Sequence, residues 1–269
     1  MKIALFGSSL LSSYWNGAAT YYRGIIRALS SRGHDITFYE PDAYDRQKYR
    51  DIEPPSWAKS VVYQPTEECA LAEIEKARSA DLIIKASGVG VLDEFLDAAV
   101  LDLSSSRSLV AYWDVDAPAT LERAQTNTTD KLRALIPRYD LILTYGGGAP
   151  VVDSYRQLGA RACIPIYNAL DPETHHPDGV RPEYAADLSF LGNRLPDREA
   201  RVEHFLLQPA YSRPERSFLL AGNGWHDKNL PPNVRALGHV FTTDHNSFNC
   251  SARIILNINR DSMARFGFS

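Results

Sequence analysis

Residues 2–40 constrain the fold of this chain more than any other stretch. An apolar run, Lys2-Ile-Ala-Leu-Phe-Gly-Ser-Ser9, is typical of a fully buried strand, and a serine-rich loop with Asn16-Gly17 follows it. Apolar residues at helical spacing then predict a helix that ends near Gly33, which can adopt the left-handed conformation beyond a helix. Residues 35–39 predict a second strand. Strand, helix and strand form a βαβ unit, whose first loop borders the ligand site in such folds.

The alternation of strands and helices continues as far as residue 167. Further strands are predicted over residues 61–63, 81–86, 108–113, 139–144 and 162–167. Helices are predicted over residues 67–79, 91–101, 121–136 and 150–158. This order indicates a mostly parallel, doubly wound sheet, and the near-continuous Ile, Leu and Val of the strands fits burial on both faces.

The composition changes after residue 167, where prolines and a glycine gather over residues 172–182. We interpret residues 1–170 as a first domain, 171–185 as an interdomain connection and 186–269 as a second domain. The second domain has predicted strands over 187–191, 217–221, 234–240 and 252–257 and a helix over 196–207. Because the chain ends directly after the last strand, the predicted fold is α/β with two Rossmann-like doubly wound parallel-sheet domains, the second incomplete.

The composition excludes several classes of protein. The chain has 269 residues, 44% of them hydrophobic, and its net charge of −4 gives no electrostatic argument for nucleic acid or a membrane surface. No apolar run approaches the length of a transmembrane segment, and the N-terminus has no leader pattern. Cys69, Cys163 and Cys250 lie far apart without a CxxC pair, which argues against disulfides or a cysteine zinc site. We expect a cytoplasmic protein with no nucleic-acid partner and no transmembrane segment.

Polar or glycine-rich loops follow most of the predicted strands. In a parallel sheet the carboxyl ends of the strands share one edge, and two such edges facing each other would enclose a cleft. Glycines there allow close backbone approach, and helix N-termini favour phosphate; the alternative for each glycine is an ordinary turn. The loop residues are Ser8, Ser9, Asn16, Gly17, Ser87, Gly88, Asp114, Asp116, Gly146, Gly147, Gly148, Gly192, Asn193, Arg194, Asn223, Gly224, Trp225, Asn259 and Arg260.

Asp114 and Asp116 are the candidate catalytic residues. They flank Val115, so on an extended chain both carboxylates point to one side, where either can act as a general base on a substrate hydroxyl. The alternative is structural: Asp116 caps the turn before Pro118, and Asp114 makes a backbone hydrogen bond.

Basic residues of the second domain are candidate partners for a diphosphate, because guanidinium binds phosphate in a bidentate manner. Arg194 and Arg260 stand out because they lie in strand-end loops, and His226 could touch a phosphate or a ribose. Individually, each basic residue could equally be a solvated surface charge. The full set is Arg194, Arg198, Lys228, Arg260 and Arg265.

Nicotinamide and several hydrolytic functions are excluded by missing motifs. Gly7 is followed by Ser8, Ser9 and Leu10, so the G-x-G-x-x-G fingerprint is absent. The chain also lacks a Walker sequence, G-x-S-x-G and H-E-x-x-H.

The segment from Phe6 to His34 resembles the first unit of two-domain GT-B glycosyltransferases. Five further segments, in their order along the chain, resemble the CgeB-like spore-protein glycosyltransferase group. They are Tyr112-Trp-Asp-Val-Asp-Ala-Pro118, Tyr139-Asp-Leu-Ile-Leu-Thr-Tyr-Gly-Gly147, Ala169-Leu-Asp-Pro172, Leu188-Ser-Phe-Leu-Gly-Asn193 and Leu256-Asn-Ile-Asn-Arg260.

The resemblance implies an N-terminal acceptor domain and a C-terminal domain that binds a nucleotide-diphosphate sugar. It places Asp114 and Asp116 toward the acceptor, with Ser8, Ser9, Asn16, Gly17, Gly146 and Gly147 on the same side. It places Gly192, Asn193, Arg194 and the loop Asn223, Gly224, Trp225 and His226 against the donor phosphates, and Asn259 and Arg260 near the nucleotide sugar. It implies transfer without a metal and no cofactor besides the donor. Asp-x-Asp binds metal in another glycosyltransferase architecture, which lacks a second α/β half.

Members of the group continue beyond the equivalent of Phe266-Gly-Phe-Ser269 into a helix with an Arg-x-Phe-Glu element, whose glutamate holds the donor ribose. We therefore expect this sequence to be a fragment of a longer protein, or a product deficient in donor binding. The leading functional prediction is a glycosyltransferase of the hexosyltransferase type that transfers a sugar to an acceptor hydroxyl. The alternatives are a sugar-nucleotide epimerase of the same architecture and a non-catalytic binding module associated with a coat.

Overall fold

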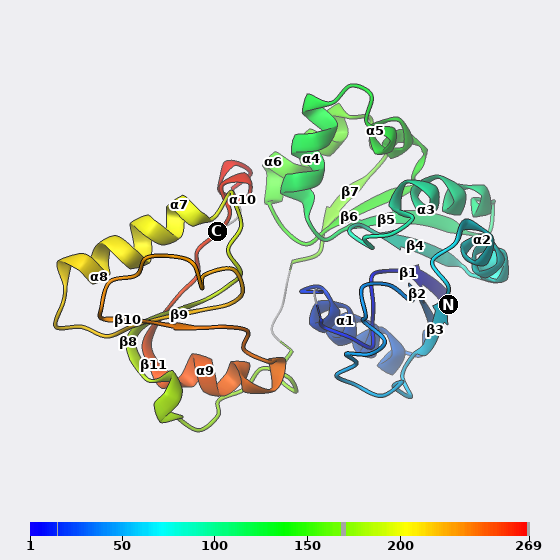
Figure 1. Ribbon diagram of the computed structural model, residues 1–269. Coiled ribbons are helices and arrows are strands. Elements are labelled where there is room, and N and C mark those ends of the chain that lie inside the picture. Colours follow the sequence, from blue (N-terminus) through cyan, green and yellow to red (C-terminus); the bar gives the residue numbers. More distant parts are fainter. Residues whose placement is uncertain (15, 168–170, 268–269) are drawn as a thin grey trace. The chain divides into compact units, whose positions relative to one another are not determined.

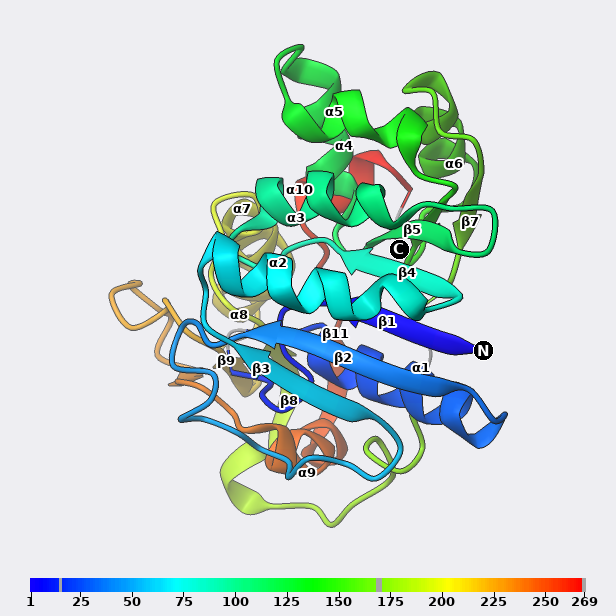
Figure 2. The same cartoon turned by 90° about the vertical axis from the view of Figure 1, so that its right-hand side faces the viewer.

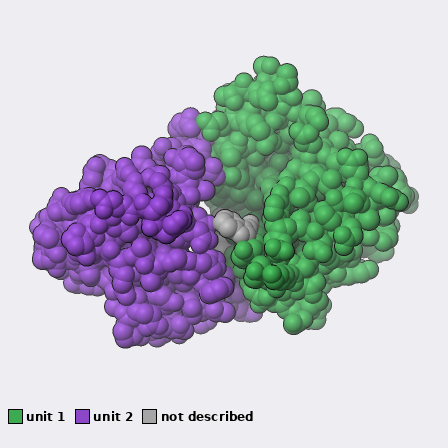
Figure 3. Space-filling model, viewed as in Figure 1, with its two compact units in different colours: residues 1–171 green, residues 172–269 purple. Residues whose placement is uncertain are grey.

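The computed structural model describes residues 1–14, 16–167 and 171–267. The chain divides into two compact units, Met1–Asp171 and Pro172–Ser269, which Figure 3 colours green and purple. The predicted end of the first domain, at residue 170, lies outside the described residues, as do the first two residues of the Ala169-Leu-Asp-Pro172 motif.

The first unit contains one parallel sheet, which within its described residues has seven strands in the order β3-β2-β1-β4-β5-β6-β7. The strands are β1 (Lys2–Phe6), β2 (Asp35–Pro41), β3 (Lys59–Tyr63), β4 (Leu82–Ala86), β5 (Leu109–Asp114), β6 (Leu141–Thr144) and β7 (Cys163–Pro165). Since β1 lies between β2 and β4, the chain reverses its direction of travel across the sheet between the ends of β1 and β4. Such a switch point is where open α/β sheets usually bind ligands.

Helices cover both faces of this sheet. Figure 2 shows α1 (Ala19–Ser31) on one face and α2 (Glu67–Lys76) and α3 (Asp93–Ala99) on the other. The range 121–136, predicted as largely helical, contains two helices, α4 (Ala117–Thr126) and α5 (Lys131–Leu135), with a break between them. Asn127 leaves the helical conformation, and the Asp130 side chain caps α5 by accepting from the Arg133 amide at 3.0 Å. α6 spans Gly148–Gln157.

The two faces of the first sheet differ in chemistry. Beneath α1, Tyr22 packs edge-on against Trp113 with ring centroids 5.3 Å apart, and both side chains are buried. Gly33 has φ +82° directly after α1, so the predicted left-handed end of this helix is confirmed. On the opposite face Lys85 and Tyr112 are cross-strand neighbours of β4 and β5, and they form the floor beneath α3.

The second unit contains a smaller parallel sheet, which over its described residues has four strands in the order β10-β9-β8-β11. The strands are β8 (Ala186–Leu191), β9 (Phe218–Ala221), β10 (Val234–Leu237) and β11 (Ala252–Leu256). One continuous helical segment covers one face and α9 (His245–Ser251) the other (Figure 1). That segment consists of α7 (Glu199–Val202), a π-helical turn (Glu203–Leu207) and α8 (Gln208–Ser212).

The predicted elements of the second unit need two corrections. The helix expected over 196–207 begins at Glu199 and continues to Ser212. Two helices were not predicted, α9 and α10 (Asp261–Arg265), because both are short and lack an apolar repeat long enough to detect. β11 is therefore not the last element of the chain.

The segment expected to connect the domains packs against α9. The Ser247 hydroxyl donates to the Asp178 carboxylate at 2.5 Å, and the Arg181 amide donates to the Ser251 hydroxyl at 2.8 Å. Arg181 also pairs with Asp244 at 2.8 Å. Residues 178–181 are thus tied to the second unit by hydrogen bonds.

The predicted α/β class with two parallel, Rossmann-like sheets is confirmed, and the second sheet is the smaller. Among the described residues, none of the helices combines the length and the apolar character needed to cross a membrane.

Candidate functional site

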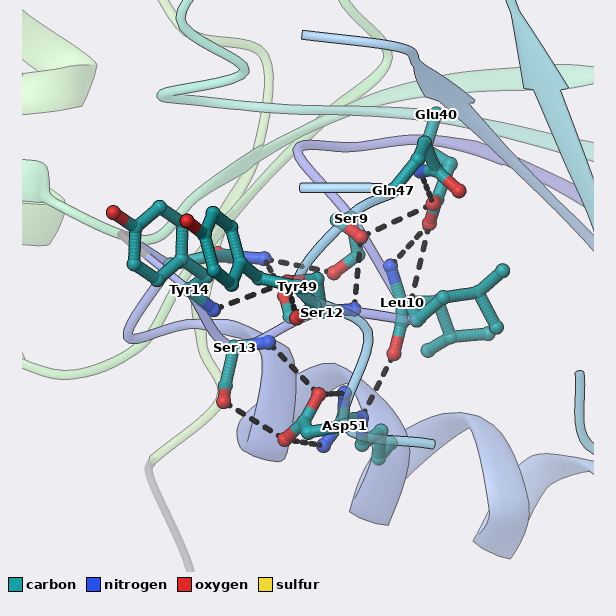
Figure 4. A network of polar contacts seen from close by, with 12 residues as sticks. Ser9, Leu10, Ser12, Ser13, Tyr14, Glu40, Gln47, Tyr49 and Asp51 are labelled. Atoms are coloured by element: carbon teal, nitrogen blue, oxygen red, sulfur yellow. Dashed lines mark hydrogen bonds and ion pairs between the residues drawn. The ribbon is translucent and has the colours of Figure 1, made fainter. Parts of the chain in front are cut away.

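The loop after β1 is held in place by a buried carboxylate (Figure 4). Glu40 lies in β2 and is fully buried. It accepts hydrogen bonds from the Leu10 amide at 2.5 Å, the Ser9 hydroxyl at 3.1 Å and the Gln47 side-chain amide at 2.6 Å. Glu40 therefore satisfies the polar groups of this loop from inside the protein.

The remaining polar side chains of the loop bond to one another. The Ser8 hydroxyl donates to Asn16 Oδ1 at 2.8 Å, and Asn16 Nδ2 donates to the Ser9 carbonyl at 2.8 Å. Ser8, Ser9 and Asn16 are all buried, whereas Gly17 is exposed. The prediction that Ser8, Ser9 and Asn16 face an acceptor is corrected: their side chains fix the shape of the loop because burial requires each polar group to have a partner.

The switch point of the first sheet is filled by Arg46. Its guanidinium Nη1 donates to the Ser8 carbonyl at 3.0 Å and to the Val89 carbonyl at 2.9 Å, which joins the loops that follow β1 and β4. Only 4% of Arg46 is exposed. Sequence reasoning missed this residue because residues 42–50 have no helical or strand periodicity, so nothing in the pattern pointed to a buried arginine.

Asp114 lies at the end of β5 and is completely buried. Its Oδ1 accepts from the Ser87 hydroxyl at 2.9 Å and the Asp116 amide at 3.0 Å, and its Oδ2 accepts from the Tyr155 hydroxyl. Burial raises the pKa of Asp114, although these hydrogen bonds oppose the rise. The prediction that Asp114 faces an acceptor is therefore corrected: its carboxylate holds the loop that carries Asp116.

Asp116 has a different environment from Asp114. It is only partly buried and lines a pocket of about 190 Å³ in the first unit. Its carbonyl accepts from the amides of Ala119 and Thr120 at 3.0 and 3.1 Å, so the backbone of Asp116 starts α4 while its side chain makes no capping bond. Of the two predicted catalytic carboxylates, Asp116 is the one that reaches a pocket.

Gly146 and Gly147 form the turn that starts α6. The Thr144 hydroxyl donates to the Gly146 carbonyl at 3.2 Å. Gly147 has φ +89° at the N-terminal cap of α6, a conformation that glycine adopts without a steric penalty. The structure therefore accounts for Gly147 as a turn residue.

In the second unit the loops after β8 and β9 pack directly on each other. Gly222 has φ +119°, and a Cβ at this position would lie 2.3 Å from the Gly192 carbonyl oxygen. The Trp225 indole donates to that same carbonyl at 2.8 Å and is 1% exposed. The prediction that Trp225 contacts a donor is corrected, since its ring lies in the core and supports the Gly192 loop.

Polar contacts continue along these two loops. The Asn223 amide donates to Asn193 Oδ1 at 2.9 Å, and the Arg194 amide donates to the Asn223 carbonyl at 2.9 Å. Gly224 packs close to the Arg194 side chain, and His226 is exposed. The structure thus brings together the loop residues that the resemblance placed against the donor phosphates.

The Arg194 side chain forms ion pairs with two carboxylates. It forms two hydrogen bonds of 2.8 Å to Glu199 and another of 2.8 Å to Asp227. Lys228 binds Glu199 as well, at 2.6 Å, and these partners lower the pKa of Glu199 to about 2. The Arg194 guanidinium is therefore paired with carboxylates of its own unit, and its contact with a diphosphate stays a prediction.

Two other guanidinium groups come close together in this unit. Arg198 Nη1 donates to the Asn193 carbonyl at 3.1 Å, and the Arg198 guanidinium lies over the Phe190 ring, 6.0 Å from its centroid. Its Nε is buried and has no hydrogen-bond partner among the described residues. Burial is the main cause of the lowered pKa of Arg198, and the positive charge of Arg260 lowers this pKa further. Arg260, which follows the partly exposed Asn259, pairs with Asp197 at 2.8 Å.

Arg198 is one of the five basic residues that the sequence suggests as diphosphate partners. Because it lies beyond the strand-end loop, the sequence gave no reason to prefer it over Arg194 or Arg260. Only the fold shows that the chain before α7 returns Arg198 toward Asn193. Within the part of the chain that the structure describes, no three His, Cys, Asp or Glu side chains gather as metal ligands would.

Comparison with known sequences gives one partial match. Residues 198–269 match a protein-family model described as glycosyl transferase-like. A search of curated proteins finds no match.

Comparison with solved structures gives matches over most of the chain. Sucrose-phosphate synthase from Thermosynechococcus elongatus has a TM-score of 0.64 at 12% identity, over 95% of this chain and 74% of that one. HepE from Anabaena in complex with UDP-glucose has a TM-score of 0.55 at 16% identity, over 90% of this chain and 70% of that one. An α-glucosyltransferase in complex with UDP and a 13-mer DNA has a TM-score of 0.59 at 14% identity, over 95% and 71%.

At these identities the similarity concerns the fold. The fold is that of the GT-B glycosyltransferases, which the sequence resemblance predicted, and several structures that share it contain UDP or a UDP-sugar.

Proposed function

We propose that this protein is a glycosyltransferase that moves a sugar from a nucleotide-diphosphate sugar to an acceptor hydroxyl without a metal. The observation that carries the proposal is the pair Arg198 and Arg260 in the second unit, beside the glycine-rich loops after β8 and β9. The family match beginning at residue 198 and the UDP-containing structures of the same fold support it.

The two arginines would bind the donor diphosphate. A buried guanidinium N–H without a partner is costly, and a phosphate oxygen would satisfy it. Arg198, together with Arg260, whose charge Asp197 offsets in part, would also offset the charge that develops on the leaving diphosphate, which is the role a metal has in other enzymes. Gly192, Asn193, Asn223, Gly224, His226 and Asn259 would complete the donor side, while Arg194 and Lys228 hold the loops in shape.

Asp116 would act as the general base. In the transfer its carboxylate takes the proton of the acceptor hydroxyl, the acceptor oxygen forms a bond to the anomeric carbon of the sugar, and the bond from that carbon to the diphosphate oxygen breaks. The nucleoside diphosphate leaves with the electron pair of that bond. Asp114 positions Asp116 through the hydrogen bond from the Asp116 amide.

The closer relationship to the CgeB-like group and the hexosyl nature of the donor are further parts of this proposal. They rest on the order of the sequence motifs. The epimerase alternative predicts an isomerised free nucleotide sugar as product, whereas a transferase yields a glycoside and a nucleoside diphosphate, so product analysis separates the two.

Titration calorimetry with UDP tests the donor side. We expect Arg198→Ala to weaken UDP binding by about tenfold or more, because one charge-assisted hydrogen-bond partner is lost. Arg253→Ala is the matched control: Arg253 lies in β11, its side chain is 75% exposed, and it pairs only loosely with Asp187 at 3.3 Å. Equal affinities of both variants and the unchanged protein, or no UDP binding at all, would overturn the proposal.

A further inference from the structure

A polar pocket of about 190 Å³ lies wholly within the first unit, between α3 and α4 and above the ends of β4 and β5. Its lining includes Asp93 and Asp97 of α3, Tyr112 of β5, Asp116 before α4, and Thr120 and Arg123 of α4. It is separate from the switch point that Arg46 fills, because Arg46 does not line it.

Two deeply buried side chains of this lining carry polar groups, a hydroxyl and a carboxylate. Tyr112 is 2% exposed, and its hydroxyl has no partner among the described residues, although its ring packs 5.4 Å from that of Tyr139. Asp97 is 5% exposed, and its Oδ1 lies 2.7 Å from the Lys85 ammonium, which leaves the carboxylate with further acceptor positions. Buried polar groups normally have hydrogen-bond partners, so the Tyr112 hydroxyl is suited to a polar ligand group.

The charges around the pocket determine which ligands it accepts. Lys85, beneath it, is already paired with Asp93 at 2.6 Å and with Asp97 at 2.7 Å. Arg123 is paired with Asp130 at 2.6 Å. Lys85 offsets only one of the two charges of Asp93 and Asp97, and Asp130 offsets Arg123, so the lining with Asp116 keeps an excess of negative charge. An anionic ligand would be repelled, whereas hydroxyl groups and ammonium groups would find acceptors.

We propose that this pocket binds the acceptor as a group the size of one sugar ring, rich in hydroxyls and either neutral or positively charged, and that it rejects acceptors bearing carboxylate or phosphate. The Tyr112 hydroxyl and the Asp97 carboxylate bond the inner hydroxyls of the ring, and Asp116 receives the reacting hydroxyl. The assignment as an acceptor pocket rests on the proposed function; the selectivity for neutral or cationic sugars does not.

Ligand-observed NMR titrations with three matched sugars test the pocket on the whole chain. Glucose, glucosamine and glucuronate share one ring and differ in charge. We expect glucose and glucosamine to bind and glucuronate to bind about tenfold more weakly, because it would face the lining carboxylates. Tyr112→Phe should weaken glucose binding by about fivefold, since it removes one hydrogen bond.

Tyr63→Phe provides a matched control. The Tyr63 hydroxyl is also buried without a hydrogen-bond partner among the described residues, lies in the same unit and does not line the pocket. Neither variant removes a hydrogen bond from the fold, so both should unfold at the temperature of the unchanged protein.

Three results would overturn the inference: no sugar binds, glucuronate binds as tightly as glucose, or Tyr112→Phe and Tyr63→Phe bind glucose equally well. UDP titration of the same samples separates this failure from that of the proposed function. If UDP binds and no sugar binds, the donor-side proposal stands and the proposed role of the pocket is wrong. If a sugar binds and UDP does not, the pocket still binds sugars and the proposed transferase function is wrong.

Discussion

At the residue scale, two carboxylates separated by one residue have opposite roles. Asp114 ends β5 inside the sheet, where burial and hydrogen bonds surround it, and Asp116 lies at the first turn of α4 beside a pocket. The same Asp-x-Asp pattern thus supplies a positioning residue and a candidate base. Substitution of Asp116 should therefore affect mainly activity, and substitution of Asp114 mainly stability.

Asp116→Asn should reduce sugar transfer by about 100-fold and leave the unfolding free energy nearly unchanged, because it removes a base but little buried structure. Transfer is measured as nucleoside diphosphate released from UDP-glucose in the presence of glucose, and stability by urea unfolding. Unchanged turnover of Asp116→Asn would remove its assigned role.

Asp114→Ala should instead lower the unfolding free energy by about 3 kcal/mol, because it strands the buried donors of Ser87, Thr120 and Tyr155. Urea unfolding measures this loss. A loss no larger than that of Asp116→Asn would contradict the positioning role.

Gly222 tests how closely the loops after β8 and β9 must approach each other. Gly222→Ala should destabilise the second unit by about 3 kcal/mol, because the new Cβ would clash with the Gly192 carbonyl and φ +119° disfavours any L side chain. Gly238→Ala is the matched control, since nothing lies within 4 Å of a Cβ there, and it should change stability by less than about 0.5 kcal/mol. Equal unfolding midpoints of the two variants in urea would show that the loops can separate.

At the scale of elements, β2 and the loop after β1 form one polar assembly. The Glu40 carboxylate replaces the solvent that the loop amides would otherwise bind, and Arg46 ties the same loop to the end of β4. The first unit therefore keeps the βαβ framework of a Rossmann-like fold, and Arg46 bridges the loops at its switch point.

Glu40→Gln should loosen this loop without unfolding the sheet. An amide in place of the carboxylate weakens acceptance from the Leu10 and Leu11 amides and places a donor near other donors. We expect hydrogen exchange of residues 10 and 11 to accelerate by about tenfold, as measured by mass spectrometry. Glu53→Gln, at an exposed position, is the control. If both variants exchange at the rate of the unchanged protein, Glu40 does not hold the loop.

At the scale of the whole molecule, the two units should respond differently to acid. In the second unit Arg194 and Lys228 lower the pKa of Glu199 from 4.5 to about 2, and Ser217 lowers that of Asp187. A lowered pKa gives stability that is present above the unfolded value and lost as the pH falls toward the folded value. The second unit therefore loses stability between about pH 4.5 and pH 2.

The first unit also contains carboxyl groups with a raised pKa, which oppose a loss of stability in acid. Burial raises the pKa of Asp97 and Asp114. A carboxyl group with a raised pKa makes its full contribution to stability below the unfolded pKa of 3.8, and this contribution is lost as the pH rises through the folded pKa. This offsets the acid sensitivity of Asp51 and Asp93, whose pKa values are lowered because hydrogen bonds and ion pairs outweigh the effect of burial.

Thermal unfolding at pH 5 and pH 3 tests this difference, with hydrogen exchange used to assign each transition to a unit. The midpoint of the second unit should fall further, and Glu199→Gln should reduce that fall. Parallel shifts of both units would contradict the assignment.

The sequence alone determined the architecture, because continuous apolar strands, helical periodicity and strand-end glycines act over a few residues and survive in almost any context. It also pointed to the strand-end loops as the place of a candidate site, which stays a prediction. The side-chain roles that it missed depend on contacts that the pattern of residues does not show. Asp114, Trp225 and Arg194 lie in loops that suggest ligand contact, yet each meets a partner within the protein.

Only the tertiary structure decided which polar side chains remain available. Burial and pairing depend on which segments meet, as Arg46 meets Val89 and Tyr155 meets Asp114, and no local pattern records this. The same rule explains the pocket: Asp97, Tyr112 and Asp116 come from three separate elements, and they gather because a parallel sheet brings the ends of its strands to one edge.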